Sequence, residues 1–335
     1  MSILNSELQL FESTVISDEA TNGGVMSHKV IDSGVVQNVF PNVTVAERAS
    51  GSTKYRKLFL KVSNADNFTL LNPQFWIDSP TAADDWAVMF AATQTDVQSD
   101  ITGAEQIYGC ATLNTDVAAG GSTIIVDVED ASLVGMFVDG GTGRITNKDT
   151  PDSVTGTEET FVISGAPTVS GTTVTMTSAS VLANSYATAD ITRVMPVYEP
   201  GDIAASSDAW AETTTAGTYD EAAYPVVLDN IGTVEQTVTL TFTDATNFTA
   251  TSDNPAVTLG SGTTGVDFIP NNADFSKPYL KLEAAGFGGT WAAGETIVFK
   301  THPAAVPIWE RRDVPAGAAS LSNNSILLAI SGESA

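Results

Sequence analysis

The sequence is poor in cysteine, histidine and basic residues. Cys110 is its single cysteine, and His28 and His302 are its two histidines. An internal disulfide is therefore excluded, and so are zinc sites built from several cysteines and histidines. Only 14 Lys and Arg residues stand against 40 Asp and Glu residues, which gives a net charge of -26. A surface this acidic repels phosphate backbones, so nucleic acid is not expected as a partner.

The sequence also lacks long apolar runs. No stretch approaches the roughly 20 residues that a membrane helix requires, so no membrane partner is expected. Met1–Phe11 has neither the basic start nor the apolar centre of a secretory signal. We therefore expect the chain to be made in the cytoplasm and kept there until something else releases it.

Thr, Val, Ala, Ser and Gly dominate the visible runs, which favours β-sheet. Hydrophobic residues make up 42% of the chain and charged residues 16%, so it can bury a core and is not disordered. Alternation and turn residues predict an all-β fold. The expected strands are residues 54–62, 70–77, 86–92, 123–128, 160–163, 172–177, 237–242, 279–282, 296–300 and 325–330.

Turn signals and changes of pattern divide the chain into four parts. Residues 1–50 are predicted to be an extended N-terminal assembly arm. Residues 51–111, together with about 200–232, form a predicted β-sandwich domain. Residues 112–199 form an inserted β-barrel-like module, and residues 233–335 a C-terminal β-sandwich domain.

The predicted arm is apolar but has no core of its own, so we expect it to lie against a partner surface. Five of the 14 basic residues follow within positions 48–61, on an otherwise acidic chain. This basic cluster either contacts an acidic surface, such as another copy of the chain, or guards a sheet edge with lysines. The candidate assembly contacts are Leu8, Leu10, Phe11, Phe40, Arg48, Lys54, Arg56, Lys57, Lys61, Trp309, Arg311 and Arg312.

No pattern in the sequence assembles a catalytic site or a cofactor site. His28 lies in the arm and His302 precedes a proline, so turn or surface positions are favoured for both. Trp210 and Trp291 are the residues that a glycan-binding platform would use, although core packing is the favoured interpretation. An oxygen-rich loop lacks the EF-hand spacing and is interpreted as a solvated turn rather than a calcium site. Its residues are Asn147, Asp149, Asp152, Glu158 and Glu159.

Residues 63–69 (SNADNFT) and 243–249 (TDATNFT) are similar, and an Asn-Pro pair follows each. Either two domains share an ancestor, or two turns have converged on the same chemistry.

Two segments carry a resemblance to a known class of proteins. Phe40–Phe59 (FPNVTVAERASGSTKYRKLF) is similar to a segment of structural proteins of tailed bacteriophages, and Pro307–Ala318 (PIWERRDVPAGA) resembles a C-terminal run of phage virion proteins. Together they cover about a tenth of the chain. The resemblance implies a non-enzymatic virion subunit, present in several copies and made in the host cytoplasm. Its partners would be copies of itself and other virion proteins.

The resemblance places such a subunit in the tail, baseplate or neck, with capsid decoration as the alternative. A carbohydrate-binding or adhesin module and a polysaccharide-degrading enzyme remain as hypotheses from other classes. The first needs an exposed aromatic platform, and the second needs two carboxylates facing each other across a cleft.

Overall fold

The structure is a computed structural model that describes residues 2–322 and 324–334. Within this part of the chain, strands dominate and the single α-helix, α1 (Val45–Ser50), is short. The prediction of an all-β fold is confirmed. Five 3-10 turns complete the regular elements: η1 (Asn5–Glu7), η2 (Gln98–Asp100), η3 (Ala131–Met136), η4 (Thr188–Asp190) and η5 (Ala284–Gly286).

The base of the molecule is a two-layered sandwich. Its larger layer, the base sheet, has the strand order β2 (Gly23–Ile31), β1 (Leu8–Val15), β3 (Ser52–Val62), β23 (Ala305–Val314), β5 (Trp86–Ala91) and β6 (Ile107–Tyr108). The second layer pairs β4 (Leu70–Ser79) with β24 (Leu327–Ser334). Leu58 and Leu60 of β3 pack against Phe75 and Trp76 of β4, so the core lies between the two layers.

The barrel module is formed by one seven-stranded sheet. Its strand order is β10 (Glu158–Val162), β9 (Thr142–Thr146), β13 (Arg193–Pro196), β7 (Ala111–Leu113), β8 (Thr123–Asp127), β12 (Thr173–Thr177) and β11 (Thr168–Ser170). Just beyond β10 and β12, Ile163 and Ser178 form a bridge that joins two strands distant in this order. The sheet therefore closes around its own core, which includes Ile124, Ile145 and Val174.

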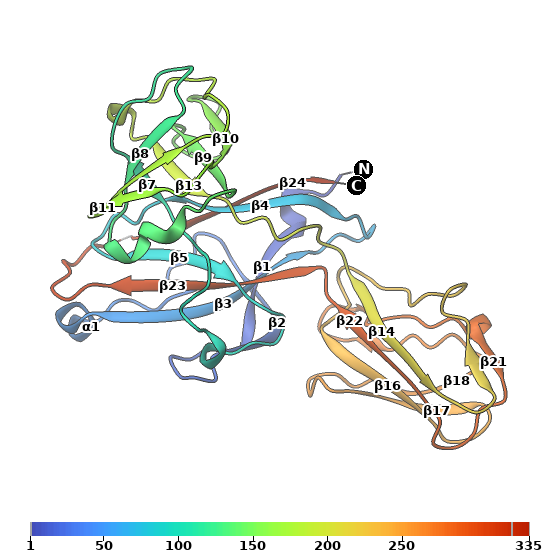
Figure 1. Ribbon diagram of the computed structural model, residues 1–335. Helices are drawn as coiled ribbons and strands as arrows, with labels where there is room; N and C mark the ends of the chain where they lie inside the picture. Colours follow the sequence, from blue (N-terminus) through green and yellow to red (C-terminus); the bar gives the residue numbers. More distant parts are fainter. Residues whose placement is uncertain (1, 323, 335) are drawn as a thin grey trace.

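Residues 206–302 form a second projecting unit, the distal module. Its main sheet has the order β14 (Ser206–Thr213), β22 (Thr296–His302), β16 (Gln236–Phe242), β17 (Asn247–Ser252) and β18 (Gly260–Thr263). Two short pairs accompany it: β15 (Gly217–Tyr219) with β21 (Phe287–Gly289), and β19 (Asn271–Asn272) with β20 (Lys277–Pro278). The core is aromatic, with Trp291 stacked on Phe242 at 3.8 Å between centroids. Figure 1 shows both modules projecting from the base.

The predicted arm is where the structure differs most from the expectation. Residues 8–15 and 23–31 are the paired strands β1 and β2, and Leu8–Glu12 pairs with β3. The partner surface that this apolar segment needs is therefore provided by the same chain. The predicted boundaries change as well, because β23 and β24 return to the base and the distal module begins at β14 rather than at residue 233.

The two similar turn sequences occupy different structural positions. Residues 243–246 form the tight connection of the β16–β17 hairpin, where Phe242 pairs with Phe248. Residues 63–69 instead connect β3 to β4, which lie in opposite layers of the base. Shared Asn and Asp turn chemistry accounts for the similarity: the Asn64 and Asp244 side chains each accept two backbone N–H groups. The placement favours convergence over duplication.

Candidate functional site

The basic cluster lies inside the molecule. β3 is flanked by β1 and β23, so it is an inner strand, and the edge-protection interpretation is wrong. Acidic residues from other segments neutralise most of the cluster: Lys54 pairs with Glu47 at 2.8 Å, and Lys57 with Asp96 at 2.6 Å. Lys54 and Arg56 both reach Asp18 at 2.9 Å. The cluster therefore holds the base together rather than presenting a positive surface to another chain.

The other candidate assembly contacts are also occupied within the chain. Phe11, Phe40 and Trp309 are buried, and Leu8 and Leu10 are half-buried against the base core. The Trp309 indole donates a hydrogen bond to Asp96 at 2.8 Å. The Arg312 guanidinium lies over the Phe40 ring, and Arg311 pairs with Asp313. Arg48 is half-buried, and its carbonyl accepts a bond from Gly317. These residues do not form a shared exposed surface.

The candidate chemical groups are dispersed. His28 lies 3.4 Å from Asp274, and His302 lies between Glu235 and Asp208. In the oxygen-rich loop interpreted as a solvated turn, Glu158 pairs with Arg144 and Lys148, and Glu159 accepts backbone N–H groups. Among the described residues, no three or more His, Cys, Asp or Glu side chains gather as metal ligands, and no helix is long and apolar enough to cross a membrane.

The two tryptophans considered for a glycan platform are engaged in packing. Trp291 is buried against Phe242. Trp210 is half-buried, stacks on Phe299 with centroids 5.1 Å apart, and donates a hydrogen bond to Glu212. Core packing is thus the structural role of both side chains.

Lys61 and Asn230 form the joint between the base and the distal module. The Asn230 side chain donates to the Phe68 carbonyl at 2.9 Å and accepts from the Ala205 N–H at 3.1 Å. Lys61 is fully buried, donates to the Ile231 carbonyl, and lies 3.9 Å from the centre of the Phe275 ring. Burial lowers the pKa of Lys61 to about 7, although Asp229 opposes the shift. A titratable ammonium group is thus enclosed at this joint.

A buried ion pair forms the joint between the base and the barrel module. Asp78 of β4 lies 3.1 Å from the Arg193 guanidinium of β13, and the side chains are 2% and 9% exposed. The Trp76 indole donates to the second oxygen of Asp78 at 3.1 Å, while Arg193 also donates to the Lys148 carbonyl. Arg144 lies 4.2 Å above the Trp76 ring. These contacts hold the module on β4.

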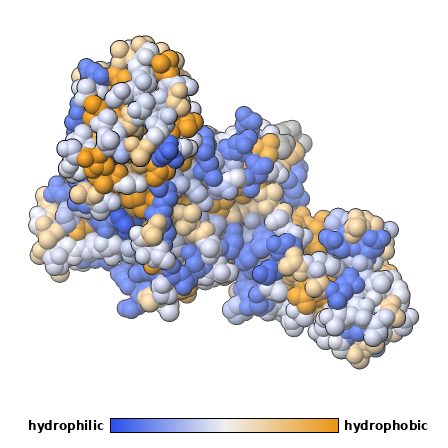
Figure 2. Space-filling view, viewed as in Figure 1, coloured by the Kyte–Doolittle hydropathy of each residue, from blue (hydrophilic) through white to orange (hydrophobic). Residues whose placement is uncertain are grey.

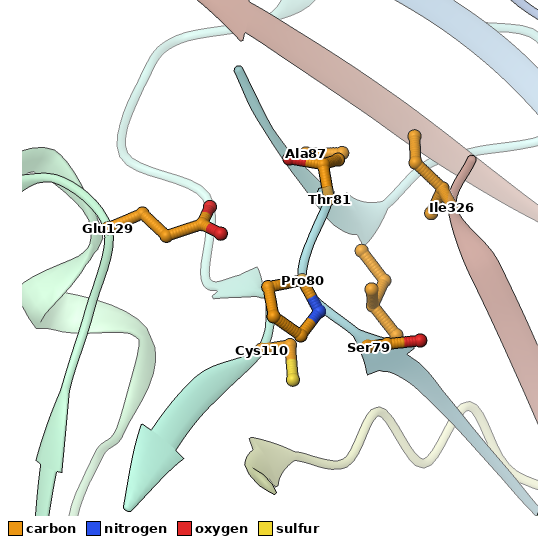
Figure 3. Close-up of a pocket in the computed structure, with 8 residues that line it drawn as sticks. Ser79, Pro80, Thr81, Ala87, Cys110, Glu129 and Ile326 are labelled. Carbon is orange, nitrogen blue, oxygen red and sulfur yellow. The ribbon is translucent and has the colours of Figure 1, made fainter. Parts of the chain in front are cut away.

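A narrow pocket near this joint contains Cys110 and Glu129. Figure 3 shows the Glu129 side chain reaching into the pocket, while the Cys110 sulfur points away from its carboxylate. The pocket leaves no room for a water molecule. Burial raises the pKa of Glu129 to about 7 and raises the pKa of the Cys110 thiol. A buried thiol that resists ionisation is a packing group, not a nucleophile.

Cys110 is accordingly expected to be unreactive in the folded protein. Only the thiolate reacts quickly with aromatic disulfide reagents, and burial suppresses both thiolate formation and reagent access. We expect less than about a tenth of the thiol to react in the time that complete reaction takes in the denatured protein. Absorbance of the released thiolate measures this, and equal rates in both states would contradict the assignment.

A second, open cleft of about 210 Å³ lies between the base and the barrel module. Its walls come from β6, from the end of η3 and the loop before β9, and from the segment after β13. The residues that line it include Gln106, Tyr108, Met136, Val138, Gly141, Thr142, Ile163, Tyr198 and Glu199. The rings of Tyr108 and Tyr198 meet at 45° with centroids 5.3 Å apart. The sequence offered no signal for this cleft, because its tyrosines lie 90 positions apart.

Comparisons with protein-family models, with curated proteins and with solved structures found no match to this chain. The functional interpretation therefore rests on the geometry of the chain and on the resemblance of its two segments.

Proposed function

We propose that this chain is a non-enzymatic structural subunit of a tailed-bacteriophage virion, most consistent with the tail, baseplate or neck. The observation that carries the proposal is the position of the two resembling segments. Although about 250 residues separate them in sequence, β3 and β23 pair along ten consecutive positions, from Ser52 with Val314 to Lys61 with Ala305. The resemblance therefore falls on one continuous structural unit at the centre of the base.

The arrangement of domains suits such a subunit. The base is interrupted twice, once by the barrel module and once by the distal module, and both project from it (Figure 1). Insertion at two points leaves a common base free to assemble while the modules vary. The buried charges serve the joints between these units, as Asp78 and Lys61 do, rather than a reactive centre.

Electrostatics gives the subunit a further property. With a net charge of -26 and its basic cluster neutralised internally, the free chain repels its own copies at low ionic strength. Assembly with copies of itself is therefore expected to proceed at ordered contacts on a virion rather than by unspecific association. Capsid decoration is the alternative location within the same proposal.

Particles released from cells that carry this gene provide the test. We expect the chain to co-purify with tailed particles through a density gradient, and antibodies against it to label one defined position in electron micrographs. A stop codon early in the gene should yield incomplete or non-infectious particles. Complete, infectious particles without the chain, or a chain found only outside particles, would overturn the proposal.

A further inference from the structure

In the open cleft beside Tyr108 and Tyr198, the side chains of Gln106 and Thr142 offer hydrogen-bond acceptors, because their donor groups are already used. The Gln106 amide nitrogen is already used, because it donates to the carbonyls of Ile107 at 3.0 Å and Met136 at 2.9 Å. Its orientation leaves the amide oxygen as the remaining polar atom of that side chain. The Thr142 hydroxyl also donates, at 3.1 Å, to the Glu199 carboxylate. The cleft is thus lined by these acceptor atoms and by the rings and hydroxyl groups of the two tyrosines.

Glu199 is held in place at the rim of this cleft. Gln74 donates to one carboxylate oxygen at 2.8 Å and Thr142 to the other at 3.1 Å. Each oxygen keeps a free lone pair, so the carboxylate retains capacity for a ligand. Neither tyrosine hydroxyl forms a hydrogen bond with another residue in the described part of the chain. Burial raises the pKa of both phenols, and both therefore stay neutral acceptor and donor groups.

The charge of the lining selects the class of ligand. The described residues that line the cleft include no Lys or Arg, while Glu199 and the acidic chain make it negative. Phosphates and carboxylates are therefore repelled. A sugar would require several donors, but those of Gln106 and Thr142 are already occupied, and only the two tyrosine hydroxyls are left. A cation needs no donors, and aromatic faces with a nearby carboxylate attract it.

We propose that this cleft binds a small organic cation of the quaternary or primary ammonium type. Tyr108 and Tyr198 form the aromatic walls, Glu199 supplies the negative charge, and the volume of about 210 Å³ suits a small head group. Figure 2 shows apolar residues gathered over the lower part of the barrel module, above the base. In the cleft itself, Met136, Val138 and Ile163 offer apolar contacts to the methyl groups of such a head group. This ligand site goes beyond the proposed structural role and does not depend on it.

Choline and tetramethylammonium are the probes for this site. The purified full chain is titrated with each chloride salt at constant ionic strength, and binding is followed by ligand-observed NMR. We expect saturable binding with a dissociation constant on the order of 1 mM, because one carboxylate and two aromatic rings give a small cation only a few weak contacts. Glucose and sodium acetate should not bind.

Two substitutions assign the binding to the cleft. Glu199→Gln keeps the shape of the side chain and should weaken choline binding roughly fivefold. Tyr108→Leu keeps apolar bulk without the aromatic face and should weaken it roughly tenfold. Glu19→Gln, an equal change of charge on the exposed surface of the base, should leave it unchanged. Unfolding curves verify that each variant is folded.

Several outcomes would overturn the inference. Absence of saturable choline binding to the wild-type chain would do so, as would binding that Glu199→Gln and Glu19→Gln weaken equally. Binding of glucose without choline would identify a sugar site instead. Because all measurements use the isolated chain, they are independent of whether it occurs in virions.

Discussion

Replacement of Asp78 with alanine is expected to lower the free energy of unfolding by about 3 to 5 kcal/mol, among the largest effects of any single substitution in this chain. The substitution leaves the Arg193 guanidinium buried without its counter-charge, and the Trp76 indole loses its acceptor. An unpaired buried charge costs more than the pair contributes when it is intact. Urea unfolding followed by tryptophan fluorescence measures the change.

A double variant separates the cost of the unpaired charge from the net contribution of the intact ion pair to stability. Asp78→Leu combined with Arg193→Met removes both charges and keeps apolar volume at the joint. Its stability should return to within about 1 to 2 kcal/mol of the wild type, because a buried ion pair and a packed apolar pair often have similar stability. Both single variants should therefore be less stable than the double variant. If Asp78→Ala loses less than about 1 kcal/mol, the joint is solvated and the assignment is wrong.

Among the strands that the sequence predicts, β16 shows the clearest alternation between a buried face and a more exposed one. In β16, Thr and apolar residues alternate, and burial alternates with them. β1 and β14 were not predicted, for different physical reasons. β1 is covered unevenly along its length, and a register irregularity interrupts its pairing with β2. β14 is mostly exposed and contains a bulge between Asp208 and Ala211, so neither strand shows a clean period of two.

The basic cluster illustrates a different limit. The sequence shows five basic residues close together, but apart from Glu47 the acidic residues that neutralise them lie elsewhere in the chain. Asp18 comes from the β1–β2 connection and Asp96 from the loop after β5. One signal for burial was available: Lys57 and Lys61 share a strand face with Phe59, while the opposite face carries Leu58 and Leu60. A strand apolar on both faces is an inner strand, and its lysines must be buried too.

Lys61 is expected to make the stability of the protein rise between pH 7 and pH 9. Burial lowers its pKa to about 7 in the folded state, from 10.5 in the unfolded chain. Over this interval the unfolded chain binds the proton and the folded chain does not, so raising the pH favours folding. The contribution is about 1.4 kcal/mol per pH unit at most, or about 2 kcal/mol over the interval. Below pH 7 both states are charged, and the joint carries the full cost of the buried ammonium group.

Lys61→Met tests this assignment, because methionine fills similar space without a charge. At pH 6.5 the variant should be more stable than the wild type by about 1 to 3 kcal/mol, because it carries no buried charge. Loss of the hydrogen bond to the Ile231 carbonyl reduces this gain. The difference should shrink or reverse by pH 9. The pKa of His302 is raised by its carboxylate neighbours, so its contribution to stability is lost over an overlapping pH range. The quantity to compare is therefore the difference in unfolding free energy between the wild type and Lys61→Met at each pH. Lys29→Met, at an exposed position, should keep the wild-type slope. Parallel curves for the wild type and Lys61→Met would mean that water reaches the ammonium group, and that the joint with the distal module opens in solution.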